Sequence, residues 1–381
     1  MSQSPLPAQY PPYPPPPRGS SLVGCAFAVS LLVNVLAFGL IVLLCAGLVM
    51  RASSDATASI SVTEKYFAGS KTARDRIAII SLDGAIMEGL LDSVYKQIEQ
   101  AGKDEAVKAT ILRINSPGGS ITASDELHRR ILELKNGDED KKIAARPLVV
   151  SMSSLAASGG YYVAAPANKI FAERSTLTGS IGVYASFPTV QELAQKVGFA
   201  MRTIKAGAVK DSGSLFKEMS PTEQQLMQDM VNDAYGQFLD VVAKGRPGLT
   251  RQKMLERFEV TPLQPDPQAH KGDNKPYTRY RADGGIFTAI KAKELGLIDE
   301  IGSLEDAVKA AATLANLSEY QAIKYQKPRT LSDLLLSQSA GSTQGNGLPM
   351  DQELLRSLLT PRVLYLAPGY EMAVVRSQQA R

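Results

Sequence analysis

The stretch Thr110-Ile-Leu-Arg-Ile-Asn-Ser-Pro-Gly-Gly-Ser120 joins a short apolar segment to a glycine-rich turn. Its first five residues are mostly aliphatic or β-branched, which is typical of a buried strand. After the turn, apolar residues recur at Leu127, Ile131 and Leu134, a spacing that predicts a helix. A buried strand, a tight turn and a helix in this order form the building unit of α/β proteins.

The same unit recurs on both sides of this stretch. Arg76–Leu82 is an earlier strand candidate, and Pro147–Met152 is a later one that leads into a second glycine turn at Ala157–Tyr161. Further short strands are predicted at Lys169–Phe171 and Ile181–Val183. Because strands and helices alternate, the sequence predicts an α/β fold.

The α/β body is expected over residues 75–330, with distinct segments on either side. Residues 1–20 are proline-rich and predict an extended tail without a core. Residues 21–50 carry no charge, and a helix of that length, at about 1.5 Å per residue, exceeds the ~30 Å hydrocarbon core, so a transmembrane anchor is predicted. A linker at 51–74 and a linker with a C-terminal apolar segment at 331–381 complete the chain.

The charges that flank the apolar segment bear on its orientation. Arg18 precedes it, whereas Arg51, Lys65, Lys71 and Arg74 follow it, and this count favours a cytoplasmic body. A large trailing domain can cross the membrane regardless of such a count, so the charges leave the orientation open. No small-residue cleavage site follows the segment, which favours a retained anchor over a cleaved signal peptide.

The composition argues against several classes of function. The net charge is only +4 and no run of Lys and Arg occurs, which argues against nucleic-acid binding. Cys25 and Cys45 both lie in the apolar segment, which argues against a disulfide framework and a cysteine metal site. No metal or cofactor is expected. His128 and His270 are the only histidines, and neither has a carboxylate in an evident position to orient it as a base.

The two glycine turns offer the chemistry of acyl transfer. Ser158 follows an apolar strand, and its small neighbours leave room for a peptide backbone, although a serine there can also simply cap a helix. The N–H of Gly159 is placed to face the carbonyl oxygen that Ser158 would attack. The turn at Gly118–Gly119 presents further N–H groups suited to an oxyanion, or is only a tight turn.

A serine nucleophile needs a base. Lysine serves when burial disfavours its ammonium form. Lys205 and Lys210 both lie among small and apolar residues, and their spacing alone does not choose between them.

Five blocks in a fixed order resemble the signal peptide peptidase A family of serine peptidases, in its short form. The resemblance covers residues 75–311. The blocks are Asn115-Ser-Pro-Gly-Gly-Ser120, Ala157-Ser-Gly-Gly-Tyr-Tyr162, Thr178-Gly-Ser-Ile-Gly182, Lys205-Ala-Gly-Ala-Val-Lys-Asp211 and the Phe287–Asp299 block with Gly-Leu-Ile-Asp at its end.

The resemblance implies a role for each site residue. Ser158 is the nucleophile, Lys210 the general base, and Ser180 a hydrogen-bond partner of the lysine amine. The N–H groups of Gly119 and Gly159 form the oxyanion hole. The implied fold is of the Clp protease/crotonase type, built from repeated ββα units. Activity is then expected to rise with pH, as the lysine loses its proton.

The resemblance also implies a setting. The body lies outside the cytoplasmic membrane, against the charge count, and the subunits assemble into a ring in which neighbours share the serine and the lysine. The implied substrates are apolar remnants of signal peptides and membrane-protein fragments. Gly285 departs from the family pattern, where relatives usually carry arginine, and so do the proline-rich tail and the polar loop at 266–284.

Two other functions share some of these features. A non-catalytic membrane scaffold would keep the fold and the anchor without hydrolysis. An acyl-CoA-binding crotonase relative would share the glycine turns, although the anchor and the Lys210 block argue against it.

Overall fold

The computed structural model describes residues 62–261, 275–326 and 362–366, and five helical residues between 30 and 39. The chain divides into two compact units, Met1–Ser59 and Ile60–Arg381. The predicted tail at 1–20 and most of the predicted anchor at 21–50 lie outside the described residues. Within the residues that are described, no helix has the length and apolar character needed to span a membrane.

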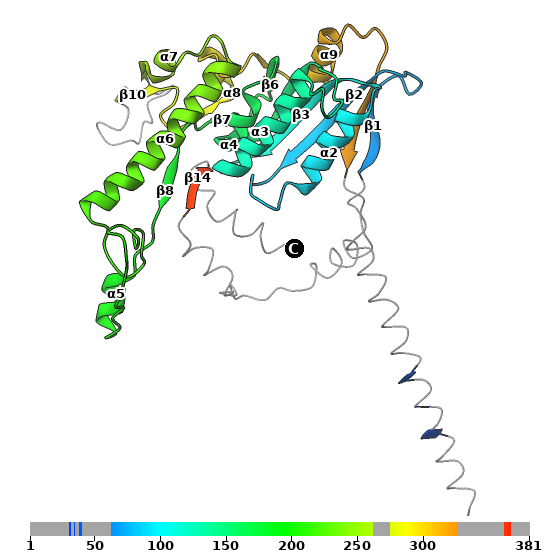
Figure 1. Cartoon of the computed structure of the whole chain (residues 1–381). Helices are drawn as coiled ribbons and strands as arrows, with labels where there is room; N and C mark the ends of the chain where they lie inside the picture. Colours follow the sequence, from blue (N-terminus) through cyan, green and yellow to red (C-terminus); the bar gives the residue numbers. More distant parts are fainter. Residues whose placement is uncertain are drawn as a thin grey trace, which may run out of the picture. The chain divides into compact units, whose positions relative to one another are not determined.

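The second unit is built on a largely parallel sheet of nine strands (Figure 1). Its path runs β1-β13-β2-β3-β5-β6-β12, with β7 beside the end of β5 and β11 beside β7. All neighbours on the path are parallel except β1 and β13, and β11 is antiparallel to β7. The strands are β1 (Thr63–Gly69), β2 (Arg76–Asp83), β3 (Val107–Ser116), β5 (Leu148–Ala157), β6 (Lys169–Ala172), β7 (Leu177–Gly179), β11 (Ile286–Thr288), β12 (Glu300–Ile301) and β13 (Gln321–Gln326).

Helices cover both faces of the sheet, because alternate residues of β2 belong to two different apolar cores. Ala78 and Ile80 belong to the core shared with α2 (Asp92–Lys103) and α3 (Ile121–Asn136). Ile77 and Ile79 belong to the core under α9 (Leu304–Leu314). Because successive residues of a strand point to opposite faces, a strand that is apolar throughout must be covered on both sides. The predicted α/β class with a parallel sheet is therefore confirmed.

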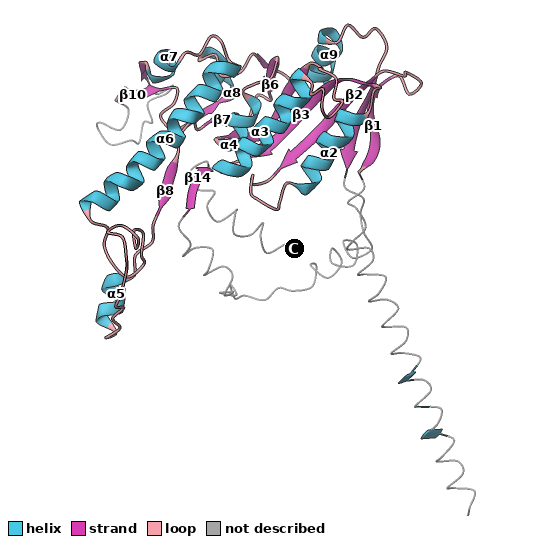
Figure 2. Cartoon of the chain, in the orientation of Figure 1, coloured by secondary structure: helices cyan, strands magenta, loops and turns pink. Residues whose placement is uncertain are grey.

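The remaining elements lie at one end of the sheet (Figure 2). The long helix α6 (Pro221–Gly245) begins with a Ser220–Glu223 capping box and extends away from the sheet. We call residues 187–220, which include α5 and precede α6, the arm. The other elements here are β4 (Gly118–Ser120), α4 (Gly159–Ala164), β8 (Tyr184–Ser186), α5 (Gln191–Lys196), α7 (Arg251–Leu255), β9 (Arg257–Val260), β10 (Tyr277–Tyr280), α8 (Ala289–Glu294) and β14 (Arg362–Leu366).

Three details differ from the sequence-based expectations. β1 lies inside the segment 51–74 that is expected to be a linker, and it pairs with β13. Ile181–Val183 is not a strand but lies between β7 and β8. β14 comes from the C-terminal segment 331–381, of which only this strand is described, and it pairs with β4 and β8 in a separate three-stranded sheet.

The Phe287–Asp299 block, which contributes to the family resemblance, ends in a structural ion pair. Arg246, just after α6, donates to both carboxylate oxygens of Asp299 at 2.8 and 2.6 Å. The N–H of Ile170 on β6 donates to the same carboxylate at 2.7 Å. Burial raises the pKa of Asp299, but these donors outweigh it and hold the pKa below its usual range.

We expect Asp299→Asn to lower the free energy of unfolding by about 2 kcal/mol at pH 7, because a charge-assisted pair is lost. A carboxylate with a lowered folded-state pKa stabilises the fold above its unfolded pKa of about 3.9 and loses that effect as pH falls. The difference in free energy of unfolding between wild type and variant, measured by urea titration, should therefore shrink as the pH falls from 7 to 3. Glu319→Gln, at an exposed carboxylate, is the control and should show no such gap.

Candidate active site

Ser158 occupies the sharp turn between β5 and α4. Its side chain is buried, and its backbone has φ 55° and ψ −117°. Few non-glycine residues of the described chain have positive φ: they are Lys142, Ser158, Ser180 and Asn316. A strained serine between a strand and a helix is the geometry of a nucleophile elbow, which presents the hydroxyl at the strand end.

The backbone around Ser158 holds this conformation in place. Its N–H donates to the carbonyl of Gly179 at 2.8 Å, and its own carbonyl accepts from the N–H of Tyr162 at 2.9 Å. The Ser158 hydroxyl, in contrast, has no hydrogen-bond partner in the described part of the chain. The turn is therefore fixed, while the group predicted to react remains available.

The two glycine turns lie against each other because they end the adjacent parallel strands β3 and β5. A Cβ built on Gly159 would lie 3.2 Å from the Gly119 nitrogen and 2.5 Å from the Ser124 hydroxyl oxygen. A Cβ on Gly119 would lie 2.0 Å from the Ile86 carbonyl oxygen. Side chains are excluded at both glycines, so their backbones can approach a substrate closely.

The N–H of Gly119 is directed away from the Ile86 segment. Ile86 donates its N–H to Gly118 at 2.9 Å and accepts from Ser120 at 2.8 Å. Because peptide groups alternate in direction along a strand, the N–H of Gly119 points away from Ile86. On that side β14 pairs with β4, with Tyr365 opposite Gly119.

Ser180 lies next to the Ser158 turn. Ala157 pairs with Gly179, which places the two serines on the ends of neighbouring strands. Ser180 is also buried, has φ 51°, and donates its hydroxyl to the carbonyl of Gly284 at 2.9 Å. Both serines named by the sequence are thus brought together at one strained end of the sheet.

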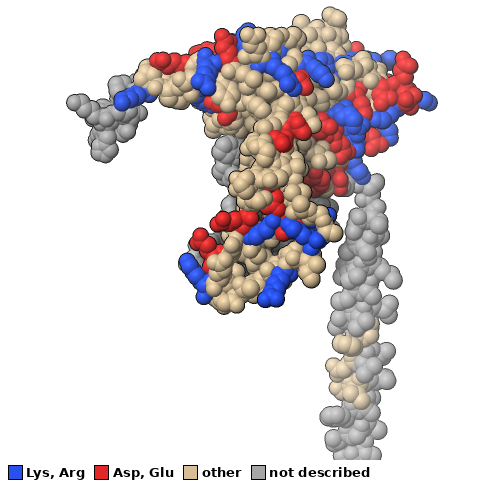
Figure 3. All heavy atoms as spheres, turned by 60° about the vertical axis from the view of Figure 1, so that its left-hand side comes forward, with Lys and Arg blue, Asp and Glu red and all other residues tan. Residues whose placement is uncertain are grey.

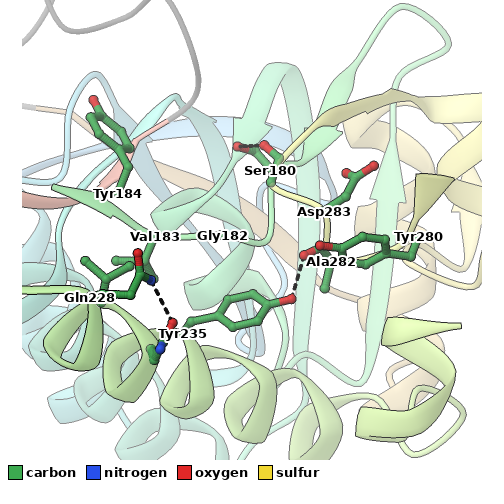
Figure 4. A pocket seen from close by; sticks show the side chains of 12 residues that line it. Ser180, Gly182, Val183, Tyr184, Gln228, Tyr235, Tyr280, Ala282 and Asp283 are labelled. Carbon is green, nitrogen blue, oxygen red and sulfur yellow. Dashed lines mark hydrogen bonds between the residues drawn. The ribbon is translucent and has the colours of Figure 1, made fainter. Parts of the chain in front are cut away.

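Ser180 lines a cavity of about 490 Å³ between α6 and the segment that precedes β11 (Figure 4). Tyr235 of α6 points into it and donates its hydroxyl to the carbonyl of Ala282 at 2.7 Å. Burial raises the pKa of Tyr235 to about 12, so this phenol acts as a donor and not as a base near neutral pH.

Within one chain, Lys210 does not contact Ser158. It lies on the arm, where it is exposed to solvent, whereas the Ser158 hydroxyl is buried and unpaired among the described residues. Figure 1 shows the arm at the far end of α6, away from the strand ends that carry the two serines.

The two lysines of the arm differ in their contacts. Lys205 forms an ion pair with Asp211 and donates to the carbonyl of Ala208 at 2.7 Å. Lys217 bridges Asp211 and Glu223, and the hydrogen bonds from Lys205 and Lys217 lower the pKa of Asp211 to about 2. The side chain of Lys210 makes no ion pair or hydrogen bond with the described residues. Ion pairs therefore hold Lys205 and Lys217 within the arm, whereas the amine of Lys210 remains free to contact another group.

His128 is not placed to act as the base. His128 lies on α3 and meets the ring of Tyr162 edge-on, with ring centroids 5.2 Å apart. Burial lowers the pKa of His128, and Ser158 has no hydrogen bond to it. His270 lies outside the described residues.

Two residues of this region are not predicted by the sequence. Ser124 lies against Gly159, as described above. Arg279 fills the space at Gly285, where a Cβ would lie 2.2 Å from its guanidinium, and it stacks over Phe287 at 4.0 Å. Arg279 therefore occupies the space that a side chain at position 285 would need. No pattern in the sequence marks either residue.

Comparisons with known proteins identify the family of this chain. The model of peptidase family S49 matches residues 140–256, a segment that contains Ser158 and Lys210. A putative protease of Synechocystis sp. is 36% identical over 259 residues, which cover 67% of this chain and 81% of that protein.

Two further relatives are similar over more than half of this chain. Protease 4 of Salmonella typhi is 34% identical over 275 residues, which cover 70% of this chain and 39% of that longer protein. A putative signal peptide peptidase SppA of Enterococcus faecium is 34% identical over 234 residues, 61% of this chain and 59% of that protein. Since the family model matches the segment with Ser158 and a protease 36% identical to this chain is covered over 81% of its length, this chain belongs to peptidase family S49, the SppA family, and is a serine peptidase.

Proposed function

We propose that the chain is a membrane-anchored endopeptidase that uses a Ser-Lys dyad to degrade apolar peptides, including remnants of signal peptides. The observation that carries the proposal is Ser158, a buried serine at a strained turn whose hydroxyl is unpaired among the described residues and whose neighbour Gly159 lies against the other glycine turn. The name of the Enterococcus faecium relative supports the choice of substrate.

In the proposed reaction, neutral Lys210 takes the hydroxyl proton of Ser158, and the Ser158 oxygen attacks the peptide carbonyl carbon. The carbonyl oxygen becomes an oxyanion that accepts hydrogen bonds from the N–H groups of Gly119 and Gly159. The C–N bond then breaks, the lysine gives its proton to the leaving amine, and an acyl ester on Ser158 remains. Water, deprotonated in the same way, releases the acid and restores the serine.

The proposed base comes from a neighbouring subunit. Lys210 is free on an exposed arm, and Ser158 has no base beside it in its own described chain. The arm also exposes large apolar side chains among charges of both signs, which is typical of a surface that meets another protein (Figure 3). Ser180 would hydrogen-bond the incoming lysine amine. The exposed apolar residues are Leu193, Val197, Phe199, Met201, Ile204 and Val209.

A substrate in this site would bind as an extended strand. β14 supports this mode, because it pairs antiparallel with β4 and β8 and sets Tyr365 opposite Gly119. A strand that adds to an exposed edge gains affinity from main-chain hydrogen bonds, which do not depend on sequence. A substrate in this position must displace β14.

The rest of the proposal concerns the setting. The uncharged segment at 21–50 supports a single-pass anchor in the cytoplasmic membrane, with the catalytic body on the extracytoplasmic side as in the family that the sequence resembles. We also propose the Clp protease/crotonase type of fold, which the parallel sheet and its glycine turns support.

Covalent labelling tests the nucleophile directly. A fluorophosphonate probe should attach to Ser158 in the folded protein, and peptide mass spectrometry should locate the adduct on the segment that contains it. Labelling should vanish after denaturation, because the reactivity depends on the folded turn. An adduct on another serine would assign the nucleophile to that residue, and no adduct on the native protein would argue for a non-catalytic scaffold.

A further inference from the structure

Ser124, on the first turn of α3, is a buried polar group that the proposed mechanism does not use. The residue is fully buried, and its hydroxyl has no hydrogen-bond partner among the described residues. Leaving a buried hydroxyl unpaired costs stability, so its presence calls for an explanation. The side chains with such an atom in the described part of the chain are Ser81, Ser124, Ser158, Gln191 and Tyr325.

The position of the Ser124 hydroxyl sets it apart from the other unpaired groups outside the site. It contacts Gly159, where a built Cβ would lie 2.5 Å from its oxygen and 3.2 Å from the nitrogen of Gly119. The hydroxyl therefore lies against Gly159, on the side of Gly159 that the Gly118–Gly119 turn also borders.

A second contact between α3 and α4 is made by Asp125, the residue after Ser124. Asp125 accepts a hydrogen bond from the Tyr162 hydroxyl at 2.7 Å. The start of α3 thus contacts α4 at its first residue and again through Tyr162. Because α4 carries Ser158 at its N-terminus, its position relative to α3 sets the geometry of the site.

We propose that Ser124 is a positioning residue: its hydroxyl packs against Gly159 and sets the separation of the Gly119 and Gly159 N–H groups. This inference rests on the proposed function, in which these groups form the oxyanion hole. The hydroxyl is small enough to fit there and polar enough to hydrogen-bond either turn when the site binds its transition state. Such contacts are often long in an empty site and tighten during the reaction.

Kinetics of Ser124→Ala and Ser124→Cys test the proposal. We expect kcat to fall roughly 10- to 100-fold with KM within about twofold, because a small shift of the donors weakens only transition-state binding. Thermal stability should be unchanged or higher, because an unpaired polar group is removed. Ser81→Ala, which removes another buried unpaired hydroxyl away from the site, is the control and should leave kcat unchanged.

A double-variant cycle tests the contact itself. Gly159→Ala should be strongly impaired, and its combination with Ser124→Ala should lose less activity than the product of the two single effects, since the closest clash is relieved. If the activity loss of the double variant equals the product of the two single losses, the result argues against a contact between Ser124 and Gly159. If Gly159→Ala does not fold, the kcat and KM values of the two Ser124 variants decide alone.

The outcomes separate this inference from the proposed function. Unchanged kcat in both Ser124 variants, together with an inactive Ser158→Ala, would overturn the role of Ser124 alone. An active Ser158→Ala would overturn the proposed function and this inference with it.

Discussion

Ser158→Ala is expected to reduce kcat on an apolar peptide by about 10⁴-fold or more, because no covalent intermediate can form without the hydroxyl. The fold should survive this change. Alanine and serine meet the same backbone strain at φ 55°, and the hydroxyl that is lost has no partner among the described residues. The free energy of unfolding should therefore stay equal or rise, which separates loss of chemistry from loss of structure.

The measurement is steady-state hydrolysis of a fluorogenic apolar peptide by the purified full-length protein in detergent, with urea unfolding of the same samples. Ser154→Ala is the matched control, because Ser154 is an exposed serine on the same strand, β5, and should keep wild-type kcat. Turnover by Ser158→Ala at more than a few per cent of wild type would rule out this serine as the nucleophile.

The sheet is predictable from the sequence because its central strands are continuous apolar runs. The predicted strands Arg76–Leu82 and Pro147–Met152 coincide with β2 and with the first half of β5. β1 is not predicted because its residues are polar and mostly exposed, as an edge strand allows. β14 escapes prediction for a different reason: its partners β4 and β8 are distant in sequence, and pairing of that kind leaves no local signal.

Some residues of the candidate site have a local sequence signal, and others do not. Glycine turns after apolar strands are visible locally, so the sequence alone points to Gly119, Ser158 and Gly159. It does not point to Ser124, because a serine on the first turn of a helix has no distinguishing pattern. The importance of Ser124 depends on an approach to Gly159 that only the packing of α3 on α4 creates. Arg279 is similar, since it reaches the space at Gly285 from another backbone position.

The choice between Lys205 and Lys210 depends on the family resemblance, and the structure adds a physical reason. Lys205 is held by Asp211, so using it as a base would break that ion pair. Lys210 makes no such contact among the described residues and remains exposed. Burial disfavours the ammonium form of a lysine, so a second surface that covers the exposed Lys210 would make it a better base. A neighbouring subunit's site, next to Ser180, would supply that burial.

Lys210→Ala is therefore expected to lower kcat by about 10³-fold or more, because the serine loses the group that accepts its proton. Lys205→Ala, five residues away on the same arm, should retain most activity, with a modest loss from the weakened Asp211 contact. The fluorophosphonate labelling rate of Ser158 should fall with Lys210→Ala, since the serine is no longer activated. If Lys205→Ala abolishes turnover and Lys210→Ala does not, the base is the other lysine.

Mixing two inactive variants tests whether the dyad is shared between subunits. When Ser158→Ala and Lys210→Ala are co-expressed in equal amounts, a ring with shared sites recovers roughly a quarter of wild-type activity, because one site in four pairs an intact serine with an intact lysine. Sites formed within one chain would recover nothing, since every chain lacks one partner. Co-expression of Ser158→Ala with the Ser158→Ala/Lys210→Ala double variant is the control and should stay inactive, because no intact serine is present.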